Sequence, residues 1–508
     1  MDLATNYAGC NPWPAGAQVL FLLDARNGIE EEILRGWIQH HSRGNGASFE
    51  APQVSINLKD ERTGFDSGQL VMALALPPET VIAPLRVVWT SEDDVFSRGR
   101  LRYLVLGDPR KPKPRQARKI AEKHPERVHL IAGAPDTVAN LRRRFELHHA
   151  LDKASSQEEF ANFVARQASL VLDMAERQLK GGRYKLPRHV AANLMASQSF
   201  NESIAALSAE TGRPREELMK EAAGYMKEMV SAPTSFWLDV YARFNTYCLG
   251  LGYEDNIVYD PAAVEKIRHI VRNNPSMLLW THKTYLDGMV VPKVLYDNDF
   301  PMPHMFGGAN MNFPGLGFLL HRAGAIFIKR SFQDNELYKL TLRHYIGYLM
   351  EKRFPMNWAF EGTRSRMGKL MPPRYGLLKY VLEACHQSDA ENIHIIPVSI
   401  SYDIIRDVEE YATEQTGRGK GAESLKWFIG YIRSLARPMG KVYMDIGEPV
   451  VLPRAPDPDD RLALSKIAFE VAVEANHVTP ITFPSLVTMS LLGAAPKALT
   501  EEEVIEDL

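Results

Sequence analysis

A histidine and an aspartate five residues apart, His282 and Asp287, form the pair in this sequence best suited to acid–base chemistry. They would not share a face of a continuous helix, where five residues correspond to a rotation of about 140°. They meet if His282 lies in the turn after a strand and Asp287 lies near the start of the next helix. The carboxylate then holds one ring nitrogen and leaves the other as a general base. The spacing alone is weak evidence, because about one such pair is expected by chance in a chain with 15 histidines.

Two cationic segments would give that base a substrate. Residues 360–369 follow an apolar run and hold three cations, two hydroxyls and two glycines. Backbone N–H and guanidinium groups in such a loop suit a phosphate monoester; the alternative interpretation is a solvated basic loop. Lys329 and Arg330 also follow a strand-like run directly. Cations beside an imidazole base indicate that the nucleophile is an alcohol on a phosphorylated molecule, because an alcohol attacks faster when a base removes its proton.

Short apolar runs separated by amphipathic helices must position these groups. Four runs are typical of buried strands and two segments between them have helical periodicity; the runs are 277–280, 325–328, 356–360 and 393–400, and the helices are 335–352 and 376–385. This alternation predicts an α/β fold with a mixed, largely parallel sheet covered by helices. His282 would then lie at the carboxyl edge of the sheet, where ligands bind in open α/β folds.

Two regions precede this domain, which we place at residues 241–490 and expect to be catalytic. Residues 1–150 are predicted to form a smaller α/β unit, and residues 151–240 have helical periodicity. Residues 110–119 are predicted to be a basic loop, because prolines interrupt them. That loop is interpreted either as a solvated linker or as a contact for anionic lipid head groups or nucleotide phosphates. Residues 491–508 are expected to be a C-terminal tail.

The composition excludes several classes of protein. The chain has 508 residues and a formal net charge of −2, so no global field attracts nucleic acid, and none is expected as a partner. Three scattered cysteines are too few for a disulfide framework or a thiolate metal site, which favours a reducing compartment; they are Cys10, Cys248 and Cys385. The first residues lack the pattern of a signal peptide. No stretch reaches the roughly 18 uncharged apolar residues of a membrane span.

Four sequence blocks, in this order, resemble the glycerol-3-phosphate acyltransferase family. The blocks are His282–Asp287, Gly324–Arg330, Phe360–Arg366 and Ile396–Tyr402. Each block is modest alone, but the combination is specific and covers roughly residues 235–490. The region before it looks like the N-terminal extension of the large bacterial members, which continue past the position where this chain stops.

The resemblance implies a role for each matching residue. His282 would be the general base on the sn-1 hydroxyl of glycerol 3-phosphate, with Asp287 orienting and polarising it. The acceptor would be bound by matching residues of the second and third blocks: Lys329, Arg330, Glu361, Gly362, Arg364, Ser365 and Arg366. Pro397 would lie on the side of the acyl donor, which is acyl-CoA or acyl carrier protein. The product would be lysophosphatidate, and no metal or organic cofactor is implied.

The same residues are compatible with other functions. Residues 399–403 and the Glu-Gly-Thr-Arg form of the third block, residues 361–364, look at least as much like dihydroxyacetone phosphate acyltransferases. That acceptor or a lysophospholipid is therefore the alternative. A condensation-type acyltransferase would need a histidine four residues before the aspartate, and Lys283 stands there. A non-catalytic phospholipid-binding paralogue is disfavoured, because His282 and Asp287 are both retained.

The expected location is the cytoplasmic face of the cell membrane, as a peripheral protein, because the product partitions into lipid. Residues 484–496 are apolar and read either as an interfacial segment or as part of a packed core.

Overall fold

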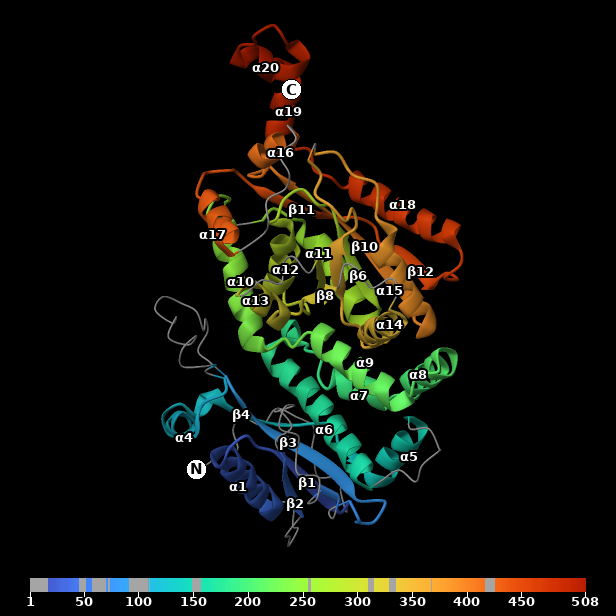
Figure 1. The fold of residues 1–508 in the computed structure, drawn as a ribbon. Coiled ribbons are helices and arrows are strands. Elements are labelled where there is room, and N and C mark those ends of the chain that lie inside the picture. Colours follow the sequence, from blue (N-terminus) through green and yellow to red (C-terminus); the bar gives the residue numbers. More distant parts are fainter. Residues whose placement is uncertain are drawn as a thin grey trace. The chain divides into compact units, whose positions relative to one another are not determined.

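The computed structural model divides into two compact units, Met1–Gly182 with Met195–Glu202, and Arg183–Leu194 with Ser203–Leu508. Figure 1 labels most of their elements. The structure describes the following residues: 17–44, 52–56, 70–71, 74–90, 108, 110–148, 157–254, 257–308, 315–328, 335–366, 368–415 and 425–508.

The first unit is built on a sheet of order β2-β1-β3-β4, with β5 paired to β3. Strands β1 to β3 are parallel, whereas β4 and β5 run antiparallel to β3. The strands are β1 (Val19–Asp24), β2 (Gln53–Ile56), β3 (Val81–Trp89), β4 (Val128–Ala132) and β5 (Asp136–Thr137). Helices α1 (Gly28–Gly44) and α4 (Pro114–Lys123) pack on one face, and α5 (Val138–His148) and α6 (Gln157–Lys180) pack on the other.

Two features of this unit differ from the sequence predictions. The compact unit extends beyond residue 150, because the apolar stripe of α6, which includes Phe160 and Leu172, packs against the sheet residues Leu20 and Leu22. The prediction of a basic loop over 110–119 is wrong from Pro114 onward, where α4 begins. Proline is tolerated at the first position of a helix, because the N–H that it lacks has no partner there in any case.

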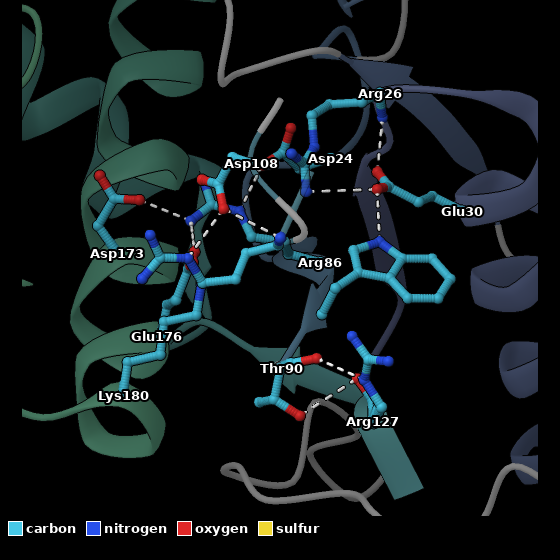
Figure 2. A network of polar contacts seen from close by, with 12 residues as sticks. Asp24, Arg26, Glu30, Arg86, Thr90, Asp108, Arg127, Asp173, Glu176 and Lys180 are labelled. Atoms are coloured by element: carbon cyan, nitrogen blue, oxygen red, sulfur yellow. Dashed lines mark hydrogen bonds and ion pairs between the residues drawn. The ribbon is translucent and has the colours of Figure 1, made fainter. Parts of the chain in front are cut away.

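A buried network of charges joins α6 to this sheet (Figure 2). Arg86 of β3 contacts Asp24 of β1 at 2.5 Å, and Asp173 and Glu176 of α6 at 2.6 and 2.9 Å. Burial alone would lower the pKa of Arg86, but the three carboxylates hold it above its usual range. Removal of one partner from such a buried pair costs about 3–5 kcal/mol. The network therefore ties α6 to strands β1 and β3.

The second unit is built on a seven-stranded sheet of order β11-β10-β6-β9-β7-β8, with β12 paired to β10. Five strands are parallel, and β11 and β12 run antiparallel to β10. The strands are β6 (Ser276–Trp280), β7 (His304–Gly308), β8 (Ile326–Ile328), β9 (Met356–Ala359), β10 (Glu391–Tyr402), β11 (Val442–Ile446) and β12 (Val450–Arg454). This architecture confirms the predicted α/β fold with a mixed, largely parallel sheet.

Helices cover both faces of this sheet (Figure 1). Alternate residues of β10, from Ile396 to Tyr402, pack with α10, α11 and α12, whereas α18 contacts the strand from the other side and also contacts α15. The helices that follow residue 183 in the chain, not all of which lie on the sheet, are α7 (Val190–Ala196), α8 (Gln198–Thr211), α9 (Arg215–Met229), α10 (Ser235–Gly250), α11 (Pro261–Asn273), α12 (Asp287–Asp297), α13 (Leu316–Arg322), α14 (Glu336–Glu351), α15 (Tyr375–Gln387), α16 (Val408–Gln415), α17 (Leu425–Ser434), α18 (Arg461–His477), α19 (Phe483–Ala494) and α20 (Glu501–Asp507). Within the described ranges, none of these helices is long and apolar enough to cross a bilayer.

Candidate active site

The turn between β6 and α12 brings His282 and Asp287 together. Strand β6 ends at Trp280, and α12 begins at Asp287. The backbone N–H of Thr281 donates to the carbonyl of Val398 in β10, which extends the sheet by one residue before the chain turns. His282 Nδ1 then lies 2.9 Å from Asp287 Oδ2. The histidine therefore lies just after the carboxyl end of a central parallel strand, and the aspartate lies in the first turn of the next helix.

Asp287 is fully buried, and its carboxylate accepts several hydrogen bonds. Besides the His282 ring, the backbone N–H groups of Lys283 and Thr284 donate to Oδ2 at 2.5 and 2.8 Å, and the Tyr402 hydroxyl donates to Oδ1 at 2.6 Å. These donors suit an ionised carboxylate, which accepts but does not donate. The carboxylate is thus held in one orientation and can keep the Nδ1 proton on the imidazole.

The second nitrogen of His282, Nε2, is not engaged by the described part of the protein. Among the residues that the structure describes, none forms a hydrogen bond with Nε2, and the side chain is 22% exposed. The Trp280 ring packs edge to face against the imidazole, with 5.1 Å between ring centroids. A half-buried imidazole with one nitrogen fixed and the other accessible is the arrangement required of a general base.

Glu361 links the third sequence block to the first. Its Oε1 accepts the N–H of His282 at 2.7 Å, and its Oε2 accepts the N–H of Met371 at 2.8 Å. The N–H of Ser365 in turn donates to the carbonyl of His282 at 2.7 Å. Burial raises the pKa of Glu361, and the two backbone donors oppose that shift. The resemblance implied acceptor binding for Glu361, whereas the structure places both of its oxygens on backbone groups that fix the histidine turn.

Arg364 is also engaged by the protein itself. Its guanidinium lies 3.8 Å from the centroid of the Tyr285 ring and donates to the Tyr285 hydroxyl at 2.9 Å. It also contacts Tyr411, whose hydroxyl donates to the carbonyl of Lys283 at 2.5 Å. Arg364 and Tyr411 therefore brace the loop between His282 and Asp287.

The other predicted site residues of the second and third blocks lie in different surroundings. Gly362 has a φ of +66°, and an added Cβ would lie 2.7 Å from Arg374 Cγ, so the turn requires glycine. Ser365 is buried, with its hydroxyl donating to the Lys369 carbonyl at 2.5 Å, whereas Arg366 is exposed. Lys329 and Arg330 lie outside the described residues.

Pro397 lies inside β10, opposite Leu279 of β6. It stands between the part of β10 that pairs with β12 and the part that pairs with β11. Proline has no N–H to donate, so a position between two pairing partners accommodates it. Its assignment to the acyl-donor side of the site stays a prediction.

Sequence reasoning missed Tyr402, which contacts Asp287, and Tyr411 and Asp407, which lie near enough to feel its charge. Tyr402 stood within the fourth block, but nothing in its local sequence indicates that its hydroxyl reaches the first block. Nothing in the sequence indicates that Lys283 reaches β10. Its amine donates to the Ile400 carbonyl at 2.6 Å and to Ser401 Oγ at 3.0 Å.

Asp407 is a buried acid beside these residues. Its titration should be visible in the pH dependence of the free energy of unfolding. Burial raises its pKa from the ordinary 3.8 to about 6, although Arg364, 4.0 Å away, opposes the shift. Between pH 4 and 6 the folded state holds a proton on Asp407 that the unfolded state releases. The free energy of unfolding contributed by this group therefore falls by about 3 kcal/mol as the pH rises through that range.

The variant Asp407→Asn lacks this titration. Urea unfolding at pH 4 to 7 should show the stability of the variant, relative to wild type, rising by about 2–3 kcal/mol across the range. Asp459→Asn, which removes a carboxylate from an exposed loop, is the matched control. A difference between Asp407→Asn and wild type that is constant with pH would contradict the prediction.

Two family models match parts of this chain. Residues 262–401 match the Acyltransferase family model, and residues 411–508 match the model of the glycerol-3-phosphate acyltransferase C-terminal region. The putative acyltransferase plsB1 of Mycobacterium tuberculosis is 32% identical over 318 residues, which are 61% of this chain and 51% of the relative. The glycerol-3-phosphate acyltransferase of Histophilus somni is 26% identical over 394 residues, which are 73% of this chain and 48% of the relative.

The chain spans about half the length of these curated relatives. Among solved structures, the 1-acyl-sn-glycerophosphate (LPA) acyltransferase PlsC of Thermotoga maritima has a TM-score of 0.30 and 16% identity, covering 47% of this chain and 78% of that chain. The first family model spans His282, Asp287 and the blocks that follow them, and the second continues to the last residue. These matches confirm the resemblance seen in the four blocks: the chain carries an acyltransferase domain and is similar to glycerol-3-phosphate acyltransferases.

Proposed function

We propose that this protein is a glycerol-3-phosphate 1-O-acyltransferase. It transfers an acyl group from acyl-CoA or acyl carrier protein to the sn-1 hydroxyl of glycerol 3-phosphate and so forms lysophosphatidate. The observation that supports this best is His282 at the end of β6, with Nδ1 held by Asp287 and Nε2 left for a substrate. The match of residues 262–401 to the acyltransferase model gives that base its reaction class.

The chemistry needs only the two substrates and the protein. His282 Nε2 takes the hydroxyl proton as the alcohol oxygen attacks the thioester carbonyl carbon, and Asp287 stabilises the imidazolium that forms. The tetrahedral intermediate collapses, the carbon–sulfur bond breaks, and the imidazolium returns the proton to the leaving thiolate. A thioester is activated enough that no covalent acyl-enzyme is required.

The cations of the second and third blocks would bind the phosphate of the acceptor. Arg366 is exposed in the loop after β9, which Glu361 joins to the histidine turn. Lys329 and Arg330 follow β8 directly in the sequence. A phosphate held by such groups presents the hydroxyl to His282 in a fixed orientation, which lowers the entropic part of the barrier.

An acceptor panel tests this proposal. Thiol release from acyl-CoA is followed with glycerol 3-phosphate, dihydroxyacetone phosphate and lysophosphatidate in parallel, on one preparation of the chain. Fastest release with glycerol 3-phosphate supports the proposed acceptor, and fastest release with another acceptor identifies the alternative enzyme. Release with none of them would overturn the enzymatic proposal and favour a non-catalytic phospholipid-binding paralogue.

We also propose that the protein binds the cytoplasmic face of the cell membrane through α19. This helix carries no charged residue, and three large side chains on it, Phe483, Met489 and Leu492, are between 67% and 71% exposed. Exposed apolar side chains of this size gain about 1.5–3 kcal/mol each when they are buried, so a lipid interface would stabilise them. This arrangement favours the interfacial interpretation of residues 484–496 over a packed core.

Vesicle flotation measures this contact. The triple variant Phe483→Ser, Met489→Ser, Leu492→Ser should lower the vesicle-bound partition coefficient at least tenfold, because it removes the apolar surface. The control is Leu462→Ser, Phe469→Ser, Val473→Ser on α18, where the replaced side chains are between 40% and 68% exposed. An equal loss in both variants, or no loss in the first, would contradict a role for α19.

A further inference from the structure

Tyr402 is the last residue of β10, and it is buried against the catalytic carboxylate. Its hydroxyl donates to Asp287 Oδ1 at 2.6 Å. The ring of His282 and the backbone N–H groups of Lys283 and Thr284 all contact the other oxygen, Oδ2. Within the described part of the chain, Tyr402 is thus the one donor to Oδ1. The other three donors hold only Oδ2. The contact with Tyr402 holds Oδ1 as well, and this fixes the rotation of the carboxylate.

The Tyr402 hydroxyl is held in place and always donates. Tyr402 pairs with Val442 of β11 in the sheet register. The Tyr402 ring packs against the Tyr253 ring, with 5.3 Å between centroids. Burial, and next the negative charge of Asp287, raise the pKa of Tyr402 well above its usual value. The phenol therefore keeps its proton throughout the range in which the protein works.

We propose that Tyr402 is a positioning residue for acyl transfer, which acts on His282 through Asp287. This inference rests on the proposed function. A donor on Oδ1 draws negative charge toward that oxygen and away from Oδ2, which faces the imidazole. The hydroxyl thereby limits how strongly Asp287 stabilises the imidazolium, and it aligns Oδ2 with Nδ1. Tyr402 touches neither substrate in this role.

The other charged and titratable groups around the pair come from different elements. Lys283 precedes α12, Glu361 and Arg364 follow β9, Asp407 and Tyr411 lie after β10, Tyr431 belongs to α17, and Tyr253 follows α10. A change of Tyr402 to phenylalanine leaves all of these side chains in the protein and removes one oxygen atom. A change in the pH profile can therefore be assigned to the contact with Asp287.

Tyr402→Phe tests the inference, with Tyr253→Phe as the matched control. Tyr253 is a buried tyrosine in contact with Tyr402, but its hydroxyl donates to the Ile404 carbonyl at 2.8 Å instead. In Tyr402→Phe the carboxylate is free to rotate and Oδ2 is no longer held in line with Nδ1, so kcat for acyl transfer to glycerol 3-phosphate should fall roughly tenfold with KM for the acceptor unchanged. The acidic limb of kcat/KM against pH should move up by about half a unit to one unit, because Asp287 then holds the imidazolium more strongly. Tyr253→Phe should show neither change.

Several outcomes would overturn the inference. One is a Tyr402→Phe variant with wild-type kcat and pH profile; another is an equal loss of activity in both variants with an unmoved acidic limb, which would mean that the hydroxyl only supports the fold. If the phenylalanine variant does not fold, 3-fluorotyrosine at position 402 keeps the shape and donates more strongly, so the acidic limb should move to lower pH; an unmoved limb would refute the role. A wild-type chain that releases no thiol with any acceptor would instead overturn the proposed function, and this role with it.

Discussion

Replacement of His282 by alanine is expected to lower kcat for acyl transfer by about 10²–10⁴-fold, the usual contribution of a general base. The imidazole is the one group in the described site with an accessible nitrogen whose partner nitrogen is fixed by a carboxylate, His282 Nδ1 to Asp287 Oδ2 at 2.9 Å. Without it, the hydroxyl must attack while protonated or lose its proton to water. Thiol release from acyl-CoA at saturating acceptor measures the change.

The matched control for this variant is His269→Ala, which removes an exposed histidine from α11 in the same unit. It should retain wild-type activity and stability. Equilibrium binding of glycerol 3-phosphate to His282→Ala should be close to wild type, since the phosphate is expected to be bound by cations of other loops. Retention of acyl transfer in His282→Ala would show that the base lies elsewhere and that the assignment of the site is wrong.

The elements that carry the site were predictable from local sequence. The runs 277–280, 325–328, 356–360 and 393–400 are strands β6, β8, β9 and β10 or lie largely within them. Each is a short, mainly apolar run bounded by polar residues, glycine or proline, and such runs are typical of strands buried in a sheet. Three strands of this sheet were missed, β7, β11 and β12. Strand β7 reads His-Met-Phe-Gly-Gly, and its glycines give no strand signal.

The partners within the site were not predictable, because they join residues far apart in the chain. Glu361 reaches His282 across 79 residues, and Tyr402 reaches Asp287 across 115. A carboxylate in a cationic loop has the same local sequence whether it faces a ligand or a backbone N–H. Arg364 shows the same limit: its charge indicated a phosphate, whereas its guanidinium packs on Tyr285. For the same reason, the periodicity of α6 predicted a helix but not the sheet on which it packs.

The variant Asp287→Asn is expected to lower kcat by about 10²–10⁴-fold, although it changes one atom. The amide carries no charge to stabilise the imidazolium, and it can no longer fix the proton on Nδ1. Its NH₂ group would also face donors, since Oδ1 accepts from Tyr402 and Oδ2 accepts from two backbone N–H groups. The measurement is kcat and KM for both substrates, together with the free energy of unfolding.

The loss in Asp287→Asn has two sources that these measurements separate. Unsatisfied donors at a buried site cost about 1–3 kcal/mol each, so the free energy of unfolding should fall by several kcal/mol. The folded fraction should nevertheless show a large loss in kcat and little change in KM, because Asp287 is buried and acts through His282. Asp297→Asn, at the far end of the same helix and paired to Lys293 at 2.7 Å, is the control and should leave kcat unchanged. If folded Asp287→Asn kept a wild-type kcat, the carboxylate would be a helix-start residue that braces the turn, and His282 would act without a charged partner.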